Sequence, residues 1–368
     1  MGTVRFGLVG YGKVAALHAK ALQAAPSCEL VAVCGRNREK RDAFATAWGI
    51  SSRGSIAEMV RQDGVEAVVI TTPHPHHHVD GHEALDAGCH VLIEKPMTLR
   101  VAEAEALTAQ AAAAGLRLSV ISQRRWYPAC RRIRSAIDKG LLGIPMLGQV
   151  TMLGWRDEAY YKSDPWRGSW DGEGGGVIVN QAPHQFDLLC WYLGEPVEIF
   201  GRWSNINHPY IEVEDSALAI VRFRSGALAS IFVSNAQKPG IHAKVHIHGS
   251  SGASVGVQTD GGAMFIAGRS GVLDTPYVDL WTIPGQEDLP GTWRQEDDML
   301  FAGIDATWYF FSLQEEDFAR AILGENTPVT TGRDGVMVAR IMEGIYRSQA
   351  TGQTVRWDQE QGQQSSQI

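Results

Sequence analysis

The sequence predicts an α/β protein in which an N-terminal, doubly wound parallel sheet precedes a C-terminal α+β domain with a large, mainly antiparallel open sheet. Two observations carry this prediction. Up to about residue 122, short buried-strand patterns alternate with helical patterns, which is typical of a parallel sheet covered on both faces. From about residue 197, apolar and polar residues alternate in runs separated by turns, which is typical of antiparallel hairpins with one exposed face.

The domain boundaries follow from this change of pattern. Residues 1–122 form the expected first domain, and residues 123–357 form a second domain for substrate binding and oligomerisation. Two late helical patterns, residues 311–323 and 335–348, are placed to pack back on the first domain. The Gln-rich residues 358–368 are expected to be a disordered tail.

Length and composition favour a globular protein that acts on small molecules. The chain has 368 residues, of which 44% are hydrophobic and 20% are charged. Its net charge of -8 argues against a nucleic acid or an anionic membrane as a partner. Five cysteines without a C-x-x-C pair suggest neither a disulfide framework nor a zinc ribbon, and no run reaches the ~18 apolar residues of a membrane span. We therefore expect a cytoplasmic protein with reduced thiols.

The first glycine-rich turn has the spacing of a dinucleotide-binding fingerprint. A strand pattern over Val4–Val9 ends in the sequence G-Y-G-K-V-A, and a helical pattern continues to Leu22. The first glycine permits the sharp bend, the second lets a pyrophosphate approach the backbone, and the alanine lets the helix pack closely on the strand. This context predicts a Rossmann domain. The fingerprint residues are Gly10, Tyr11, Gly12, Lys13, Val14 and Ala15.

The end of the second strand pattern, Leu30–Cys34, bears on the choice of cofactor. An NAD site usually has Asp or Glu at this place to bind the ribose 2′-hydroxyl, whereas this chain has Gly35, Arg36, Asn37 and Arg38. A small residue followed by guanidinium groups accommodates a 2′-phosphate. Solvated loop arginines are the alternative interpretation. We expect NAD(P) as the cofactor, with NADP preferred over NAD.

A third strand pattern, residues 65–72, leads into a turn rich in histidine and proline. Thr72, Pro73, His74 and His76 are expected to line the cofactor, and His77 begins a helix that runs to residue 87. The histidines lack the geometric spacing and the acidic or cysteine partners of a metal site. We therefore expect no metal here.

The fourth strand pattern ends in the sequence E-K-P. The apolar residues Val91–Ile93 run directly into Glu94, Lys95 and Pro96. Because open α/β sheets bind ligands at the carboxyl ends of their strands, we expect Lys95 to face the ligand. A surface lysine after a strand is the alternative. A helix over residues 99–114 and a strand over residues 116–122 continue the alternation.

The second half contains a polar cluster after a glycine-rich run, residues 172–176. Asn180, His184 and Asp187 would share one face of an uninterrupted helix, but Pro183 would kink that helix unless it lies in the first turn. Residues from about 258 to 300 are expected to form long loops. The other expected elements are a helix over 129–139 and strands over 146–153, 198–204, 216–223, 227–234 and 242–249.

Together these motifs resemble the Gfo/Idh/MocA family, which includes glucose-fructose oxidoreductase and inositol dehydrogenase. The resemblance rests on Gly10-Tyr11-Gly12, on the T-P-H-P-H run at residues 72–76 and above all on Glu94-Lys95-Pro96, and it spans almost the whole chain. It implies that Lys95 lies beside the nicotinamide and the substrate hydroxyl. Family members commonly have a D-x-x-x-H pattern after the glycine-rich run. The matching residues are Asn180 and His184, which implies that His184 takes the proton of the substrate hydroxyl.

Asn180 departs from the family pattern, because asparagine lacks the charge with which an aspartate stabilises an imidazolium. We expect Asn180 to bind a substrate hydroxyl instead, and Asp187 to orient His184. Aromatic and arginine side chains between residues 155 and 167 suit a hydroxyl-bearing ring. Arg167, in a W-R-G sequence, resembles family positions near the nicotinamide carboxamide.

The resemblance implies an NAD(P)-dependent dehydrogenase that acts on a secondary hydroxyl, or the corresponding ketone, of a sugar, glycoside or cyclitol, as a homo-oligomer (dimer or tetramer). An NAD-dependent glycosidase of the same fold and a non-catalytic cofactor-binding regulator are the alternatives. The expected catalytic residues are Lys95 and His184. The expected cofactor contacts are Gly10, Tyr11, Gly12, Lys13, Val14, Ala15, Gly35, Arg36, Asn37, Arg38, Thr72, Pro73, His74, His76, Glu94, Lys95, Gln123, Trp166 and Arg167. The expected substrate contacts are Lys95, Tyr127, Trp155, Arg156, Asn180 and His184.

Overall fold

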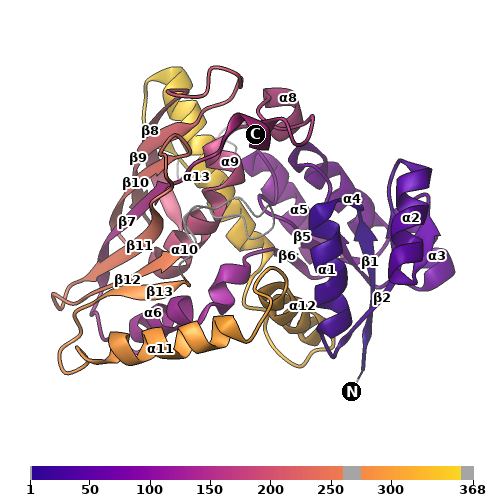
Figure 1. Ribbon diagram of the computed structural model, residues 1–368, viewed down its shortest axis with the longest axis horizontal. Helices are drawn as coiled ribbons and strands as arrows, with labels where there is room; N and C mark the ends of the chain where they lie inside the picture. The colour runs from indigo at the N-terminus through magenta and orange to yellow at the C-terminus, as the bar shows by residue number, and fades with distance from the viewer. Residues whose placement is uncertain (1, 260–274, 358–368) are drawn as a thin grey trace, which may run out of the picture. The chain divides into compact units, whose positions relative to one another are not determined.

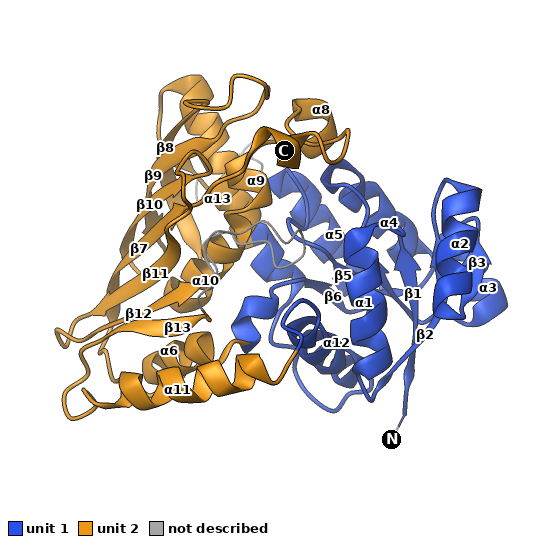
Figure 2. Ribbon diagram, viewed as in Figure 1, with its two compact units in different colours: residues 1–126, 305–336 blue, residues 127–304, 337–368 orange. Residues whose placement is uncertain are grey.

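Two compact units make up the computed structural model, which describes residues 2–259 and 275–357. Unit 1 contains residues 1–126 and 305–336, and unit 2 contains residues 127–304 and 337–368 (Figure 2). Each unit is therefore assembled from two separate stretches of the sequence. The expected tail, residues 358–368, lies outside the described residues. None of the helices in the described ranges has the length and apolar composition needed to cross a membrane.

Unit 1 is built on a six-stranded parallel sheet with the strand order β3-β2-β1-β4-β5-β6 (Figure 1). The direction of winding reverses between β1 and β4, which is the place where ligands bind in such sheets. The predicted doubly wound sheet is confirmed. Its strands are β1 (Val4–Val9), β2 (Cys28–Cys34), β3 (Ser51–Arg53), β4 (Ala67–Ile70), β5 (His90–Ile93) and β6 (Leu118–Val120).

The helices of unit 1 connect these strands and cover the sheet. No helix or strand was predicted between residues 39 and 64, where the structure has α2, β3 and α3. Strand β3 has only three residues, all of them half-buried, so no apolar run marks it. The helices are α1 (Lys13–Ala24), α2 (Arg38–Trp48), α3 (Ile56–Asp63), η1 (His74–His76), α4 (His77–Asp86), α5 (Val101–Ala113), η2 (Gln123–Trp126) and α12 (Tyr309–Ile322).

The segment at residues 305–336 completes the core of unit 1. The Phe318 ring of α12 lies 6.5 Å from the Phe6 ring of β1, and both side chains are buried. The fully buried Arg125 pairs with Asp334 at 2.7 Å, so an ion pair also joins the early and late parts of this unit. Burial of these aromatic side chains supplies a stabilisation of ~2 kcal/mol each, which ties α12 to the sheet.

Unit 2 is built on an eight-stranded sheet with the order β13-β12-β11-β7-β10-β9-β8-β14. All its pairs are antiparallel except β7 with β10, which is parallel. The predicted mainly antiparallel sheet is confirmed. Its strands are β7 (Pro145–Leu153), β8 (Pro196–Ser204), β9 (Ser216–Phe223), β10 (Leu228–Ser234), β11 (His242–Gly249), β12 (Ser254–Thr259), β13 (Tyr277–Trp281) and β14 (Val355–Arg356).

One face of this sheet is covered by α10 and the other is open. A Cβ on Gly148 of β7 would lie 2.7 Å from a Leu193 methyl carbon, so glycine is required for the close approach of α10. Buried and exposed residues alternate along β9 and β10, as expected for a sheet with one covered face. The helices are α6 (Pro128–Asp138), α7 (Glu158–Tyr161), α8 (Trp170–Glu173), α9 (Val177–Asn180), α10 (Pro183–Leu193), α11 (Leu289–Ala302) and α13 (Gly332–Thr351), which begins in unit 1.

The expectation of long loops from about residue 258 to residue 300 is wrong over two stretches. Strand β13 pairs with β12, and the fourteen-residue helix α11 follows it. Helix α11 has no apolar stripe that sequence reasoning could detect, because Asp297 is its one residue classed as buried. Residues 260–274 lie outside the described residues.

Candidate active site

The turn between β1 and α1 leaves the N-terminus of α1 open. Gly10 has a φ of +105°, and a Cβ there would lie 2.8 Å from Thr71 Oγ1, so this position requires glycine. A Cβ on Gly12, the N-cap of α1, would meet none of the described atoms within 4 Å. Ala15 is fully buried, whereas Lys13 is exposed. Open amides at the start of a helix bind phosphate groups, so this turn fits the pyrophosphate of a dinucleotide.

Tyr11 shapes the end of β2. A Cβ on Gly35 would clash with the Tyr11 ring. The Tyr11 hydroxyl accepts the backbone N–H of Asn37 at 2.9 Å, and the Asn37 side chain accepts the backbone N–H of Lys40 at 3.0 Å. Asn37 thereby caps α2. Gly35 is thus required for packing against Tyr11, whatever its effect on the cofactor.

The two arginines after Gly35 are held differently. Arg36 Nη2 donates to His76 Nδ1 at 3.3 Å, which joins the residue after β2 to η1, the turn after β4. Arg38 Nε lies 3.5 Å from Asp42 Oδ2 within α2, and the Arg38 side chain is 87% exposed. Since β2 and β4 are parallel, Arg36 and His76 meet at the carboxyl edge of the sheet.

His77 joins the two loops that carry most of the predicted site in unit 1. It is fully buried, with Nε2 2.8 Å from the Thr72 carbonyl oxygen and Nδ1 2.8 Å from the Pro96 carbonyl oxygen. Burial lowers the pKa of His77. Sequence reasoning treated His77 only as the start of a helix. Its place one residue after the T-P-H-P-H run was the signal available.

Glu94 lies at the end of β5 and makes two contacts inside unit 1. Its Oε2 accepts the backbone N–H of Lys95 at 2.9 Å, and its Oε1 lies 3.1 Å from Nε2 of His18. The other nitrogen of His18, Nδ1, lies 2.6 Å from Oε1 of Glu315 in α12. Lys95 itself is half-buried. Neither His18 nor Glu315 was among the predicted site residues, because no local pattern connects α1, β5 and α12.

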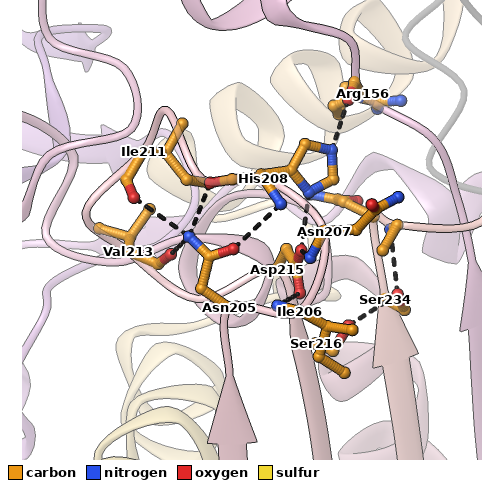
Figure 3. Close-up of polar contacts among 12 residues, drawn as sticks. Arg156, Asn205, Ile206, Asn207, His208, Ile211, Val213, Asp215, Ser216 and Ser234 are labelled. Carbon is orange, nitrogen blue, oxygen red and sulfur yellow. Dashed lines mark hydrogen bonds and ion pairs between the residues drawn. The ribbon is translucent and has the colours of Figure 1, made fainter.

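In unit 2, the residues after β7 rest on a buried histidine (Figure 3). His208 Nε2 is 2.7 Å from the Arg156 carbonyl oxygen, and Nδ1 is 2.7 Å from Asp215 Oδ2. The Trp155 ring lies 5.3 Å from the His208 ring. Although burial opposes it, hydrogen bonds from His208 and from two backbone N–H groups lower the pKa of Asp215. This cluster fixes the backbone that presents Trp155 and Arg156.

A second buried network contains three of the predicted residues. The Tyr160 hydroxyl accepts hydrogen bonds from Arg167 Nη1 at 2.5 Å and from Gln181 Nε2 at 3.1 Å. The Arg167 guanidinium lies 4.3 Å from the centroids of both the Tyr160 ring and the Trp166 ring. Asn180 lies in the same network, with its Nδ2 3.4 Å from the Tyr160 hydroxyl. The structure thus brings Trp166, Arg167 and Asn180 around one tyrosine.

Glu173 gives a physical reason for asparagine at position 180. Asn180 Nδ2 donates to Glu173 Oε1, and Glu173 Oε2 accepts the backbone N–H of Gly168 at 2.6 Å. Glu173 is almost fully buried. An aspartate at position 180 would place two carboxylates in contact in a buried setting, which is costly. Sequence reasoning missed Glu173, although it lies within the glycine-rich run.

The predicted face shared by Asn180, His184 and Asp187 is interrupted. Asn180 ends α9, Pro183 is in the first turn of α10, and His184 follows it. His184 is half-buried, whereas Asp187, one turn later, is buried. Pro183 therefore starts a helix rather than kinking one.

Glu214 holds the backbone of the glycine-rich run. Its Oε1 accepts the backbone N–H groups of Gly176 and Ile178 at 2.9 and 3.0 Å and the Tyr346 hydroxyl at 2.9 Å. Its Oε2 is buried and has no hydrogen-bond partner among the described residues. Burial raises the pKa of Glu214 to about 7.

The remaining predicted residues lie on either side of the boundary at residue 126. Gln123 begins η2 in unit 1, and Tyr127 precedes α6 in unit 2, with its ring 5.8 Å from the ring of Phe301. His74 is buried in η1 and Pro73 precedes that turn.

Within residues 2–259 and 275–357, no group of three or more His, Cys, Asp or Glu side chains is placed to hold a metal ion.

The Rossmann domain and its open helix N-terminus define the class of the protein, which is that of the dinucleotide-binding α/β proteins. The model of the oxidoreductase family with an NAD-binding Rossmann fold matches residues 4–122. The model of the Gfo/Idh/MocA C-terminal domain matches residues 130–255. The chain belongs to the Gfo/Idh/MocA family of oxidoreductases, and the resemblance found in the sequence is confirmed.

Individual relatives extend this comparison over most of the chain. A 1,5-anhydro-D-fructose reductase from Ensifer adhaerens is 28% identical over 95% of this chain and 97% of its own length. An inositol 2-dehydrogenase from Rhizobium meliloti is 29% identical over 76% of this chain and 83% of its own. The crystal structure of the WlbA dehydrogenase from Bordetella pertussis, in complex with NADH and UDP-GlcNAcA, matches with a TM-score of 0.83 at 28% identity, covering 97% of this chain and 98% of that chain.

Replacing Glu214 by Gln should flatten the pH dependence of stability. Since burial raises the pKa of Glu214 from 4.5 to about 7, its contribution to stability is present at low pH and is lost as the pH rises through that range. Glu214→Gln should remove a loss on the order of 3 kcal/mol between about pH 4 and about pH 8. Urea unfolding at both pH values measures it, with the exposed Glu158→Gln as the control. Equal pH dependence in the Glu214→Gln variant and the wild type would contradict this assignment.

Proposed function

We propose that the protein transfers a hydride between a nicotinamide cofactor and a secondary hydroxyl, or the corresponding ketone, of a sugar, glycoside or cyclitol. The observation that carries the proposal is the position of Lys95 at the carboxyl end of β5. This strand is next to β4, which pairs with the dinucleotide-binding strand β1. The named activities of the relatives support a hydroxyl-bearing ring, since they act on an anhydrosugar and on inositol.

In this proposal Lys95 and His184 are the two catalytic residues, and each has its own role toward the substrate hydroxyl. The Lys95 ammonium stabilises negative charge that develops on the oxygen. His184 accepts the hydroxyl proton in the oxidative direction and returns it in the reductive direction, because histidine exchanges protons near neutral pH. The nicotinamide, when bound, exchanges the hydride with the carbon that carries this oxygen.

The other predicted contacts would orient the ring of the substrate. Trp155 and Tyr127 offer aromatic faces for C–H groups, while Arg156 offers donors and the Asn180 side-chain oxygen an acceptor for hydroxyl groups. Support comes from the buried His208 and Glu173 contacts, which hold the backbone at Arg156 and the amide of Asn180. Arg167, fixed between the Trp166 and Tyr160 rings, is proposed as the contact to the nicotinamide carboxamide.

We also propose that NADP is preferred over NAD. Arg36 supports this preference, because its contact with His76 holds a guanidinium at the carboxyl edge of the sheet. No carboxylate stands at Gly35 to repel a 2′-phosphate. Arg38 contributes less, since it is exposed and lies near Asp42.

The open face of the sheet in unit 2 is proposed to bind a second copy of the chain. Phe200 lies opposite Ile220 in the β8–β9 pair, and Leu218 lies opposite Phe232 in the β9–β10 pair, and all four side chains are exposed. Cross-strand neighbours of this kind form a contiguous apolar patch, which is typical of an interface. A two-fold axis would pair the patch with itself.

The cysteines support the predicted cytoplasmic location. All five are free thiols, and four of them are buried. Proteins of reducing compartments keep their cysteines in this state. We therefore propose a reducing compartment, in line with the sequence-based expectation.

Replacing Lys95 by Met or His184 by Ala should lower kcat by ~100-fold or more, because each change removes a group that stabilises the transition state. Cofactor affinity should be retained, and the exposed Lys20→Met should behave as wild type. Absorbance of reduced nicotinamide with a polyol panel measures turnover. Unchanged turnover in both variants would contradict the proposed mechanism. Sugar release without net NAD(P)H would indicate a glycosidase, and no turnover of any polyol or glycoside would indicate a regulator.

Replacing Arg36 by Ala should raise the Kd for NADP by ~10-fold and leave the Kd for NAD unchanged, because a charge-assisted hydrogen bond to phosphate is lost. Arg117→Ala is the matched control, since this exposed arginine precedes β6 at the opposite edge of the parallel sheet. Fluorescence titration measures both constants. Tighter binding of NAD than of NADP by the wild type would show that the proposed preference is wrong.

Replacing Ile220 by Lys should dissociate the oligomer, because it places a charge in the middle of the apolar patch. Met299→Lys is the control, as Met299 is exposed to a similar extent on α11. Light scattering coupled to gel filtration gives the mass of each variant. A wild-type monomer, or an Ile220→Lys variant of unchanged mass, would exclude this surface as the interface.

A further inference from the structure

We propose that His18 is a positioning residue for Lys95 and acts through Glu94. The imidazole, held in turn by Glu315, keeps the Glu94 carboxylate ionised and oriented beneath the turn that carries the lysine. This inference rests on the proposed function, in which Lys95 binds the substrate oxygen. It assigns a role to three buried residues that the mechanism has not used.

The contacts form an uninterrupted chain from α12 to the backbone of Lys95. Glu315 Oε1 lies 2.6 Å from His18 Nδ1, and His18 Nε2 lies 3.1 Å from Glu94 Oε1. Glu94 Oε2 accepts the Lys95 backbone N–H at 2.9 Å. Both carboxylate oxygens of Glu94 are engaged, so the plane of this group is fixed. Any rotation of Glu94 would release the backbone N–H of Lys95.

Burial makes this arrangement depend on charge. The side chains of His18 and Glu315 are completely buried, and that of Glu94 is 11% exposed. A carboxylate in such a place remains ionised only when a cation or donors compensate it. Burial alone would lower the pKa of His18, but the hydrogen bonds and charges of Glu315 and Glu94 raise it to about 9. At neutral pH the imidazolium is therefore the cation that compensates Glu94.

The pKa values of the two carboxyl groups that contact His18, those of Glu94 and Glu315, shift in opposite directions. Burial alone would raise the pKa of Glu94, but the hydrogen bond and charge of His18 and the charge of Lys95 lower it. For Glu315 burial prevails and raises the pKa to about 7. Glu94 is thus the member of the pair that carries negative charge throughout the neutral range, and it is the one bonded to Lys95.

Helix α4 contributes further polar groups near the turn. His77 Nδ1 lies 2.8 Å from the Pro96 carbonyl oxygen, and burial lowers the pKa of His77. Asp80 accepts the Thr72 hydroxyl at 2.5 Å. Two histidines therefore hold the turn, His77 at the Pro96 carbonyl oxygen and His18 through Glu94.

Removal of the His18 charge has two opposite effects on Lys95. Direct loss of a nearby cation would favour the protonated lysine. Loss of the partner of Glu94 would instead make this buried carboxylate take up a proton, which removes an anion beside Lys95 and disfavours the protonated lysine. Action through Glu94 therefore predicts a lower titration midpoint for Lys95, the sign opposite to that of a direct effect.

The experiment compares wild type, His18→Gln and Glu94→Gln in chains labelled with ¹³C at lysine Cε. The Lys95 signal, assigned by its absence in Lys95→Arg, is titrated by NMR in the protein without substrate. Both variants should lower the midpoint of Lys95. They should also lower kcat by ~10-fold, with the cofactor Kd unchanged in His18→Gln, because the lysine is misplaced while the dinucleotide turn is intact. The double variant should behave like Glu94→Gln alone.

A raised or unchanged midpoint in His18→Gln would overturn the proposal. Glu315→Gln covers the case in which His18→Gln does not fold, because it keeps an acceptor for His18 Nδ1. Because it removes a charge that raises the pKa of His18, it should change the Lys95 midpoint and kcat in the same direction as His18→Gln, and an unchanged midpoint and kcat would equally overturn the proposal. The titration needs no substrate. A lowered midpoint in a protein that turns over no polyol would refute the dehydrogenase while the link between His18 and Lys95 stands.

Discussion

The pairing of β1 with β2 on one side and β4 on the other is the constraint on which the nucleotide-binding half depends. Parallel strands must be joined by crossovers, so their carboxyl ends gather at one edge of the sheet. That edge holds the open N-terminus of α1, Arg36 with His76, and the turn that carries Lys95. Strand order thus brings together groups that local motifs place at the ends of separate strands.

Compensation of buried charge is a second constraint, and it is met in both units by histidine or amide side chains. His18 lies between two carboxyl groups, His208 lies between Asp215 and a carbonyl oxygen, and Asn180 donates to Glu173. Removal of one partner from such a pair costs several kcal/mol, because the other is left uncompensated. These clusters lie directly behind residues proposed to contact substrate, so rigidity is concentrated where precise placement matters.

The sequence was sufficient for the parallel sheet, the dinucleotide turn and the E-K-P strand end, because each depends on residues close together in the chain. It was insufficient for contacts that join distant elements. In the sequence His18 is one residue of an amphipathic helix, and only the structure shows that Glu315 of α12 contacts it. From the sequence, Asn180 means the loss of a carboxylate, whereas the structure shows that Glu173 supplies a carboxylate in contact with Asn180. Helix α11 was not predicted because it is mostly exposed and its sequence has no periodic apolar pattern.

The return of residues 305–336 to unit 1 bears on how the chain matures during synthesis. His18, Phe6 and Arg125 leave the ribosome long before Glu315, Phe318 and Asp334, with the whole of residues 127–304 in between. N-terminal domains usually fold first as they emerge. Here the surface of unit 1 that α12 covers stays exposed on the nascent chain until residues 305–336 have been synthesised.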